Sequence, residues 1–322
     1  MAEKISIVVP CYNEEPALPP YYKAMAEEML SFNKKYKDVE FEIILVNDGS
    51  RDKTLEYVRR IAAADKRFRY ISFSRNFGKE AALLAGLKES TGDYVAVMDA
   101  DLQDPPNLLE EMYCGIKEEG YDCVGTRRVT REGEPKLRSF FARLFYKIIN
   151  KMSDTEIVDG ARDYRLMKRD MVNAILSMPE KNRFSKGLFS WVGFKTKWLE
   201  YVNVERVAGE TSWSFWKLFK YSIEGFLGFT TMPLVLPIVF GVFTNIASVL
   251  TIVIAAIINA VQGYSVSGVT WFITISLFTA SLILLSIGIV SMYFTKMYSE
   301  IKNRPVYIVA ERGGYACAQN KD

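Results

Sequence analysis

Short runs of apolar residues alternate with longer stretches of helical spacing in the N-terminal part of the chain. Five runs have the length and composition of buried strands and end in turn residues: 5–9, 41–46, 68–73, 94–98 and 122–124. Strands that alternate with helices predict an α/β domain with a mostly parallel sheet. In such sheets, ligands bind at the carboxyl ends of the strands.

Polar residues gather directly after four of these runs, where the strands end. The polar segments are 11–14, 47–50, 74–79 and 99–104. Since carboxyl ends of parallel strands meet at one edge of the sheet, we expect a single crevice there. Neither G-x-G-x-x-G nor G-x-x-x-x-G-K-[ST] occurs in the chain, so a dinucleotide site and a P-loop have no support.

Asp99 and Asp101 follow the fourth predicted strand. Side chains two residues apart in an extended chain point to the same side, so these carboxylates converge. Hard oxygen ligands suit Mg²⁺ or Mn²⁺ shared with substrate phosphates, and Gln103 offers a further carbonyl oxygen. The pair therefore predicts a site for a divalent cation.

A lone D-x-D pattern also has a simpler interpretation. In it, Asp101 is a solvated turn residue and Asp104 caps a helix that the two following prolines begin. Asp48, with the Gly and Ser after it, would likewise be a turn and helix cap. This interpretation explains poorly why Asp48 and Glu14 stand at neighbouring strand ends.

Composition narrows the chemistry further. The 41 basic and 38 acidic residues leave a net charge of +3, and the chain contains no histidine. Ser-His-Asp catalysis and His-ligated zinc are therefore excluded, and a general base must be a carboxylate, Tyr, Lys or Cys. The balanced charge predicts no nucleic-acid partner. Four cysteines without C-x-x-C spacing indicate a reducing compartment.

The second half of the chain divides by composition. Basic residues concentrate between 127 and 147, and we predict a helix at about 136–151. A mixed stretch at 159–207 closes a first domain that spans 1–210. No Asp, Glu, Lys or Arg occurs from residue 225 to residue 295.

About 20 apolar residues span a bilayer, and the uncharged run is long enough for two such spans. We expect them at about 233–261 and 269–295, as a transmembrane hairpin within 231–298. Just before it, large apolar residues recur at helical steps and predict an interfacial amphipathic helix over 211–230. Those residues are Trp213, Trp216, Phe219, Ile223 and Phe226. A buried amphipathic helix of the first domain is the alternative.

Lysines flank the hairpin, whereas its turn carries no charge. They are Lys217 and Lys220 before it, and Lys296 and Lys302 after it. The positive-inside rule then places both flanks in the cytosol and the turn outside. We therefore expect a multi-pass protein of the cytoplasmic membrane, with the first domain, both termini and a tail at 299–322 in the cytosol.

The motifs together resemble a known family. Segments 7–14, 46–54 and 99–106 look like the motifs of family 2 glycosyltransferases, which have the Rossmann-like GT-A fold. Segments 160–167 and 183–188, together with Asn-Phe-Gly-Lys at 76–79, are similar to the polyprenyl-phosphate glycosyltransferases. These include the dolichol-phosphate mannose synthases and the bactoprenol glucosyltransferases, and the hairpin matches the bactoprenol branch. The resemblance covers nearly the whole chain.

This resemblance implies roles for individual residues. The implied donor-site residues are Pro10, Tyr12, Glu14, Asp48, Lys79 and Asp99. The implied ligands of Mg²⁺ or Mn²⁺ are Asp99, Asp101 and Gln103. The implied contacts of the acceptor phosphate are Arg127, Arg138 and Arg165. The residues expected to act on the reacting groups are Asp163, Asp101 and Arg127.

Two features leave alternatives open. Asp163 is the implied base or positioning group on the acceptor side, whereas its neighbours Arg162 and Arg165 suggest a simple ion pair. Many relatives have a serine four residues after the counterpart of Arg138, but this chain has Ala142, so one acceptor contact is missing or replaced.

The implied activity is inverting transfer of a hexose from a nucleotide sugar to a polyprenyl phosphate at the cytosolic face of the membrane. UDP-glucose and undecaprenyl phosphate are the specific expectation, with N-acetylglucosamine, mannose and aminoarabinose as alternative sugars. We also expect a homo-oligomer. A processive polysaccharide synthase lacks support because Q-x-x-R-W is absent. A catalytically silent membrane scaffold or sugar-nucleotide sensor is the alternative of another class.

Overall fold

The computed structural model describes residues 2–128, 158, 160–181, 183–201 and 239–314, with gaps at 245, 248–249, 252, 255–256, 258–260 and 262–266. The strands are β1 (Glu3–Cys11), β2 (Val39–Asn47), β3 (Phe68–Phe73), β4 (Tyr94–Val97), β5 (Cys123–Arg128), β6 (Ala161–Lys168), β7 (Thr196–Tyr201) and β8 (Val309–Gly313). The helices are α1 (Leu18–Lys35), α2 (Thr54–Ala64), α3 (Lys79–Glu89), α4 (Leu108–Lys117), α6 (Arg169–Ser177), α7 (Ser185–Trp191) and α10 (Gly268–Ile301).

The described strands form one mixed sheet in the order β7-β5-β6-β4-β1-β2-β3-β8. Strands β4, β1, β2 and β3 pair in parallel, as expected from the alternating pattern. Strand β6 runs antiparallel to β4 and β5, and β8 runs antiparallel to β3. The parallel centre aligns the carboxyl ends of β1, β2 and β4, so their following loops share one edge.

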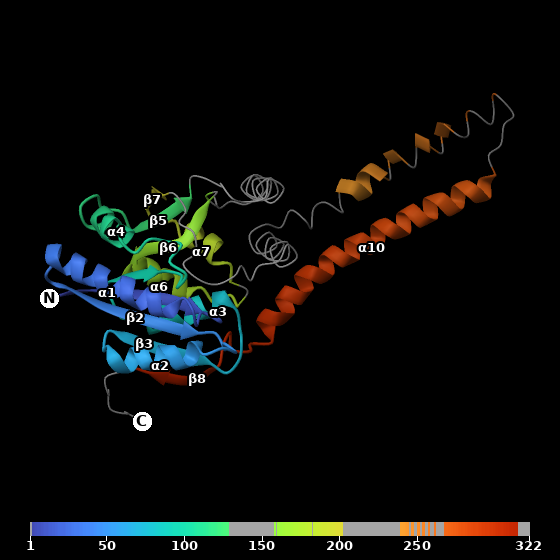
Figure 1. Cartoon of the computed structure of the whole chain (residues 1–322). Helices are drawn as coiled ribbons and strands as arrows, with labels where there is room; N and C mark the ends of the chain where they lie inside the picture. Colours follow the sequence, from blue (N-terminus) through green and yellow to red (C-terminus); the bar gives the residue numbers. More distant parts are fainter. Residues whose placement is uncertain are drawn as a thin grey trace.

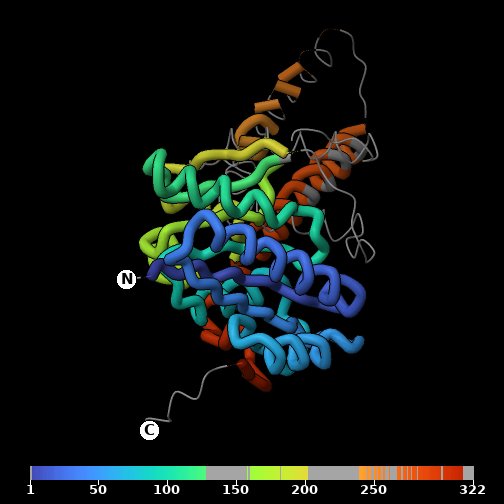
Figure 2. The backbone as a smooth tube through the Cα atoms, turned by 60° about the vertical axis from the view of Figure 1, so that its left-hand side comes forward, coloured from blue at the N-terminus to red at the C-terminus, as the bar shows by residue number. Residues whose placement is uncertain are grey.

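Helices cover both faces of this sheet, as Figure 1 shows. Alternate strand residues explain the layering: Ile5, Ile7 and Val9 pack with α1, α2 and α4, whereas Val8 faces α3 on the other side. Figure 2 looks toward the face formed by α1, α2 and α4. Helices α6 and α7 join α3 on the opposite face. The α/β architecture expected from the sequence is confirmed.

All five strands predicted from apolar runs are present, with ends shifted by a few residues. Strands β6, β7 and β8 were not predicted. The sequence of β6, Ala-Arg-Asp-Tyr-Arg-Leu-Met-Lys, carries four charges, yet Tyr164, Leu166 and Met167 are fully buried and Arg165 is only 3% exposed. Pairing with β4 and β5 overrides its polar composition.

The segment expected as a C-terminal tail contributes an edge strand. In β8, Glu311 forms a salt bridge with Arg59 of α2 and accepts a hydrogen bond from Tyr70 of β3. Just before β8, Tyr307 stacks on Phe73, with ring centroids 4.9 Å apart. The chain therefore returns from α10 to the sheet of the first domain, as Figure 1 shows.

Helix α10 projects away from the α/β domain (Figure 1) and includes the second expected membrane span. Its segment Trp271–Tyr298 is long and apolar enough to cross a membrane, with a mean hydropathy of 2.3. At its end, the Glu300 carboxylate accepts the backbone N–H of Lys181 at 2.9 Å, and the Lys181 ammonium donates to Asn303 at 2.7 Å. The α6–α7 connection is thus bonded to the end of the apolar helix.

Several expectations lie outside the described residues. These are the helix at 136–151, Arg138 and Ala142, the interfacial helix at 211–230 with Lys217 and Lys220, and part of the span at 233–261. They remain expectations from the sequence.

Candidate functional site

The loops after β1 and β2 hold each other by side-chain bonds to backbone groups. Asn13, which adopts a positive φ of 55°, accepts the Arg51 N–H at 2.9 Å, and its own N–H donates to the Ser50 hydroxyl at 3.0 Å. The Glu14 N–H donates to Thr54 at 2.8 Å. These reciprocal bonds fix the two loops side by side.

Three of the expected donor-site residues lie on this first loop or just before it. Pro10 is in β1 next to Val46, Tyr12 is 38% exposed at the strand end, and Glu14 precedes α1. A partly exposed aromatic ring above parallel strand ends provides a surface on which a flat base can stack. The structure thus brings Pro10, Tyr12 and Glu14 to the expected edge.

Asp48, at the end of β2, is almost fully buried. One carboxylate oxygen accepts the Phe77 N–H at 2.6 Å, and the other accepts the Gly78 N–H at 2.9 Å. Burial raises the pKa of Asp48, and the two backbone N–H groups act in the opposite direction. Asp48 therefore fixes the loop that leads into α3, and Gly78 permits the sharp entry because its φ is 100°.

The loop after β4 presents Asp99 and Asp101, while Ala100 between them is buried. Because β4 ends at Val97, Asp99 and Asp101 lie in the following loop rather than in an extended strand, and Asp99 bonds the Lys79 ammonium. Leu102 has a positive φ of 56°, which is rare for a branched residue. The turn allows Asp101 to accept the Gln103 N–H at 3.1 Å. Backbone strain of this kind concentrates at functional sites.

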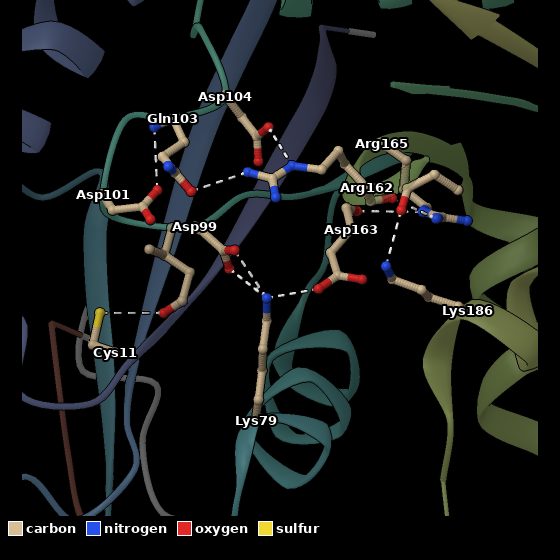
Figure 3. A network of polar contacts seen from close by, with 12 residues as sticks. Cys11, Lys79, Asp99, Asp101, Gln103, Asp104, Arg162, Asp163, Arg165 and Lys186 are labelled. Carbon is tan, nitrogen blue, oxygen red and sulfur yellow. Dashed lines mark hydrogen bonds and ion pairs between the residues drawn. The ribbon is translucent and has the colours of Figure 1, made fainter. Parts of the chain in front are cut away.

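A lysine connects the ends of β4 and β6. The Lys79 ammonium lies 2.7 and 2.9 Å from the two oxygens of Asp99, and 2.6 Å from Asp163 Oδ2. Figure 3 shows its side chain rising from α3 between the two carboxylates. The three charged groups come from segments far apart in the sequence, so the fold itself assembles this cluster.

The charges in the cluster determine its ionisation. Burial raises the pKa of Asp163, but the Lys79 and Lys186 ammonium groups outweigh this effect and hold it well below its usual range. Burial lowers the pKa of Lys79, while Asp163 and Asp99 raise it to a net value well above normal. Asp163 is therefore a carboxylate and Lys79 an ammonium at neutral pH.

A second polar network lies beside the first (Figure 3). Arg162 donates to Gln103 Oε1, to Asp104 Oδ1 and to the Tyr201 hydroxyl, each at 3.2 Å, and Tyr201 donates to Asp104. Asp104 is 1% exposed, and burial raises its pKa against the effect of Arg162. Asp104 is thus a buried partner of β6 and β7 rather than the cap of α4. The network ties the Asp99–Asp104 loop to the far half of the sheet.

In the described part of the chain, neither of the arginines near Asp163 in the sequence is bonded to its carboxylate, although Arg165 helps to lower its pKa. Arg162 pairs with Asp104, and Arg165 donates to the backbone carbonyls of Arg162 at 2.8 Å and Asp163 at 3.3 Å. The Arg165 guanidinium also lies 4.0 Å from the ring centroid of Phe189 and is buried. Arg165 therefore supports the backbone that carries Asp163.

Arg127, expected near the acceptor, stands close to the end of β5. Its Nε donates to Glu200 of β7 at 2.9 Å, and its backbone is paired with Ala161 of β6. The side chain is about half exposed. The described contacts do not bring it into the Asp99–Lys79–Asp163 cluster.

The structure also adds residues that the sequence did not single out. Lys186 of α7 donates to the Ala161 carbonyl at 2.9 Å and lies near Asp163. Ser185 beside it donates to Glu80, the neighbour of Lys79. The only sequence signals were the segments 160–167 and 183–188, which match family motifs without indicating these contacts.

The donor atoms at the β4 end fit a divalent cation that takes further ligands from a substrate. Asp99 and Asp101 supply hard carboxylate oxygens, but the Gln103 carbonyl oxygen faces Arg162. Within the described part of the chain, no group of three or more Asp, Glu, Cys or His side chains gathers as a metal site. Water or a bound phosphate would supply the remaining oxygen ligands of a cation here.

Comparisons of the chain with a family model and with individual proteins point to the same family. Residues 6–176 match the Glycosyl transferase family 2. CsbB of Bacillus subtilis, whose name assigns it to the glycosyltransferases without a substrate, is 43% identical over 99% of this chain and 93% of its own length. The prophage bactoprenol glucosyl transferase homolog of Escherichia coli is 40% identical over 95% and 98% of the two chains.

Two further matches complete the comparison. The bactoprenol glucosyl transferase of Shigella phage SfII is 40% identical over 95% of this chain and 97% of its own. Among solved structures, a mannosyltransferase from Pyrobaculum calidifontis in complex with GDP-Man and Mn²⁺ covers 89% of this chain and 88% of its own, at 16% identity and a TM-score of 0.43. That likeness is too low to transfer its ligands.

Proposed function

The chain belongs to glycosyl transferase family 2, and from this premise we propose that it transfers glucose from UDP-glucose to undecaprenyl phosphate. That it is a glycosyltransferase follows from its family and its relatives. The lipid acceptor and the sugar are inferred from relatives named bactoprenol glucosyl transferases at 40% identity over nearly the full chain.

One observation of the site carries the proposal: Asp99 and Asp163 meet at a single ammonium, that of Lys79. Asp99 stands on the loop where donor phosphates are expected, and Asp163 stands on β6 at the opposite side of the cluster. A transfer reaction needs donor and acceptor on either side of one reacting carbon. The cluster supplies charged groups for both sides.

On the donor side, we assign base and ribose contacts to Pro10, Tyr12 and Glu14. Asp48 shapes the neighbouring loop through its bonds to Phe77 and Gly78. The bonded loops after β1 and β2 would hold these contacts in place before the donor binds. Preorganisation of this kind lowers the entropic cost of binding.

Asp99 and Asp101 would hold a divalent cation, with Gln103 near enough to join them if it leaves Arg162. Such a cation, when bound, offsets negative charge on the leaving diphosphate. Asp101 is bonded to the Gln103 N–H at 3.1 Å, which orients its carboxylate. The residues thus position the donor rather than form a covalent bond to the sugar.

On the acceptor side, a phosphate oxygen of the lipid attacks the anomeric carbon as the bond to the nucleoside diphosphate breaks. Attack from the opposite face inverts the configuration, and the transition state resembles an oxocarbenium ion. The acceptor phosphate has a second pKa of about 6 and is mostly ionised at neutral pH, so its activation needs little proton transfer. Asp163 positions this acceptor, with Arg127 and Arg138 as its proposed phosphate contacts.

We place the reaction at the cytosolic face of the cytoplasmic membrane. The apolar segment of α10 and the expected span at 233–261 would form the hairpin, and lysines flank the uncharged run on both sides. Helix α10 is bonded to the α6–α7 connection, close in sequence to Lys186. The apolar helix would thus hold the catalytic domain next to its lipid acceptor, and we propose a homo-oligomer in the membrane.

The proposal is tested with membranes that contain the full chain, undecaprenyl phosphate and a panel of radiolabelled nucleotide sugars. We expect label from UDP-glucose in the lipid phase, and none with Asp101→Asn at equal protein level. Label from another sugar would replace glucose in the proposal. Donor binding without any lipid product would support the sensor alternative instead.

The metal assignment has its own prediction. Excess chelator should abolish transfer, and added Mg²⁺ or Mn²⁺ should restore it, because the two carboxylates would hold the cation that offsets charge on the leaving diphosphate. Asp101→Asn should have the same melting temperature as the wild type, since Asp101 is only partly buried. Full activity in chelator would contradict the assignment.

A further inference from the structure

Lys79 occupies an unusual position for a cation. It is the first residue of α3, where the helix dipole presents its positive end and disfavours a positive side chain. Its ammonium nevertheless stays in the site, because two carboxylates from different strands converge on it. Asp48 and the positive φ of Gly78 fix the backbone from which it extends.

The contact with Asp99 has the geometry of a bound cation. The Lys79 ammonium is within 2.9 Å of both Asp99 oxygens, on the bisector side of the carboxylate. A divalent metal bound to both oxygens would occupy nearly the same place, at about 2.0–2.6 Å from them. Two cations cannot share this position, so the ammonium and such a metal compete for Asp99.

We propose that Lys79 is a stand-in cation on Asp99, which must be displaced before a divalent metal can bind there. This inference rests on the proposed function, in which Asp99 is a metal ligand. The displaced ammonium keeps its bond to Asp163 and turns toward the donor diphosphate, which is the donor-binding role the family resemblance implies for it. The metal then binds together with the nucleotide sugar, because the negative charge of the diphosphate offsets the loss of the Asp99–Lys79 bond.

A purely structural ion pair predicts a different behaviour. Such a pair would hold α3 to β4 and β6, and its loss would lower stability without changing metal affinity in a charge-specific way. The stand-in role predicts that metal affinity without donor is limited by the ammonium itself. Metal binding to the donor-free protein therefore separates the two roles.

Lys186 supplies a matched control, because it is a second cation near Asp163. In the described contacts its ammonium donates to the Ala161 carbonyl at 2.9 Å and not to Asp99. Lys186→Met removes the same charge from the same region without freeing Asp99. Lys79→Arg keeps a cation that can pair with Asp99 through two nitrogens. The main variant is Lys79→Met, which removes the ammonium. If Lys79→Met fails to fold, Lys79→Gln takes its place, because it removes the charge but keeps a hydrogen-bond donor.

The experiment measures Mn²⁺ binding to the purified full chain in detergent, without nucleotide, from the electron paramagnetic resonance signal of free Mn²⁺. We expect Lys79→Met to bind Mn²⁺ at least about tenfold more tightly than the wild type, since a unit charge adjoining the ligand is removed. Lys79→Arg and Lys186→Met should stay within about threefold of the wild type.

Equal Mn²⁺ affinity in Lys79→Met and the wild type would overturn the proposal, as would absence of binding in both. Equal tightening by Lys186→Met would also overturn it, because a general field effect would then explain the change. Neither donor nor acceptor is present, so the result is independent of the proposed transfer. If the chain proves inactive in transfer but Lys79→Met binds Mn²⁺ more tightly, the inference about Lys79 stands. If the chain is active but Mn²⁺ affinity does not change, the inference fails and the proposed transfer stands.

Discussion

At the scale of single residues, the ionisation of Asp163 decides between the two roles open to it. Lys79 and Lys186 hold its pKa well below the usual value of about 3.9 for an aspartate. A general base works best with a pKa near the operating pH. Asp163 is therefore a poor base at neutral pH but a stable negative charge, which favours a positioning role.

We predict that Asp163→Asn lowers the transfer rate by about 10²-fold or more with donor affinity unchanged. Because the pKa of Asp163 is lowered in the folded protein, its carboxylate stays ionised at every pH above the usual pKa of an aspartate. The loss of rate in Asp163→Asn should therefore not vary between about pH 6 and 8. Rates of both proteins across this range test the prediction.

A defect of Asp163→Asn that grows toward low pH would indicate a base, because more of the acceptor phosphate is protonated there. Loss of donor affinity alone would move Asp163 to the donor site. Lys186→Met is a useful comparison, since it changes the field at Asp163 without removing the carboxylate.

At the scale of elements, α3 must approach the sheet closely to deliver Lys79. Gly86 makes this possible, because a Cβ there would lie 2.1 Å from Val8 Cγ1 of β1. Both residues belong to the core on the α3 side of the sheet. The distance between α3 and β1 thus contributes directly to the position of the site.

We predict that Gly86→Ala destabilises the protein, although alanine favours a helix by about 1 kcal/mol over glycine. Overpacking against Val8 should cost about 1–3 kcal/mol and outweigh that gain. In the Val8→Ala background the penalty should shrink, with a coupling of about 0.5–3 kcal/mol. Denaturant unfolding of the four proteins measures this cycle, and additive effects would show that the two residues do not clash.

Local pattern was enough to predict the parallel half of the sheet and the polar loops at its edge. It was not enough for β6 and β8. Arg165 in β6 is buried because Phe189 and two carbonyls receive its guanidinium, and β8 exists because Phe73 and Tyr70 of β3 receive Tyr307 and Glu311. Phe189 and the β3 partners lie far away in the sequence, and a local pattern contains no information about them.

The same reason separates the predicted site residues from their observed partners. Asp99 and Asp163 were identified by motif, but the Lys79 ammonium between them depends on the α3 packing described above. The alternative ion pair of Asp163 with its neighbouring arginines is not what the described contacts show. Arg162 is on the other face of the strand, because successive side chains alternate, and Arg165 is bonded to backbone carbonyls while it helps to lower the pKa of Asp163. Arg162 instead reaches Asp104.

At the scale of the whole molecule, the sheet receives strands from both sides of the apolar segment in the sequence. Strands β1–β7 precede α10, and β8 follows it. If α10 crosses a membrane, residues before the hairpin and after it must lie on the same side. This pairing agrees with the expectation from the flanking lysines that both sides lie in the cytosol.

We predict that a cysteine placed at Ser265, in the uncharged segment where the sequence predicts the turn, reacts with a membrane-impermeant thiol reagent from outside the cell. A cysteine at exposed Ile308, just before β8, should react only after the membrane is opened. Both are introduced into a chain whose own cysteines are replaced by serine or alanine. Labelling of the turn from the cytosolic side would mean that the apolar segment does not form a membrane-crossing hairpin.

In the proposed reaction, one site joins a nucleotide sugar to a lipid phosphate. The most direct measurement combines purified full chain, UDP-glucose and synthetic undecaprenyl phosphate, and follows UDP release together with the mass of the lipid. We predict one UDP released for each lipid that gains the mass of a single hexose residue. UDP release without a hexosyl lipid, in the presence of metal and acceptor, would contradict the proposed transfer.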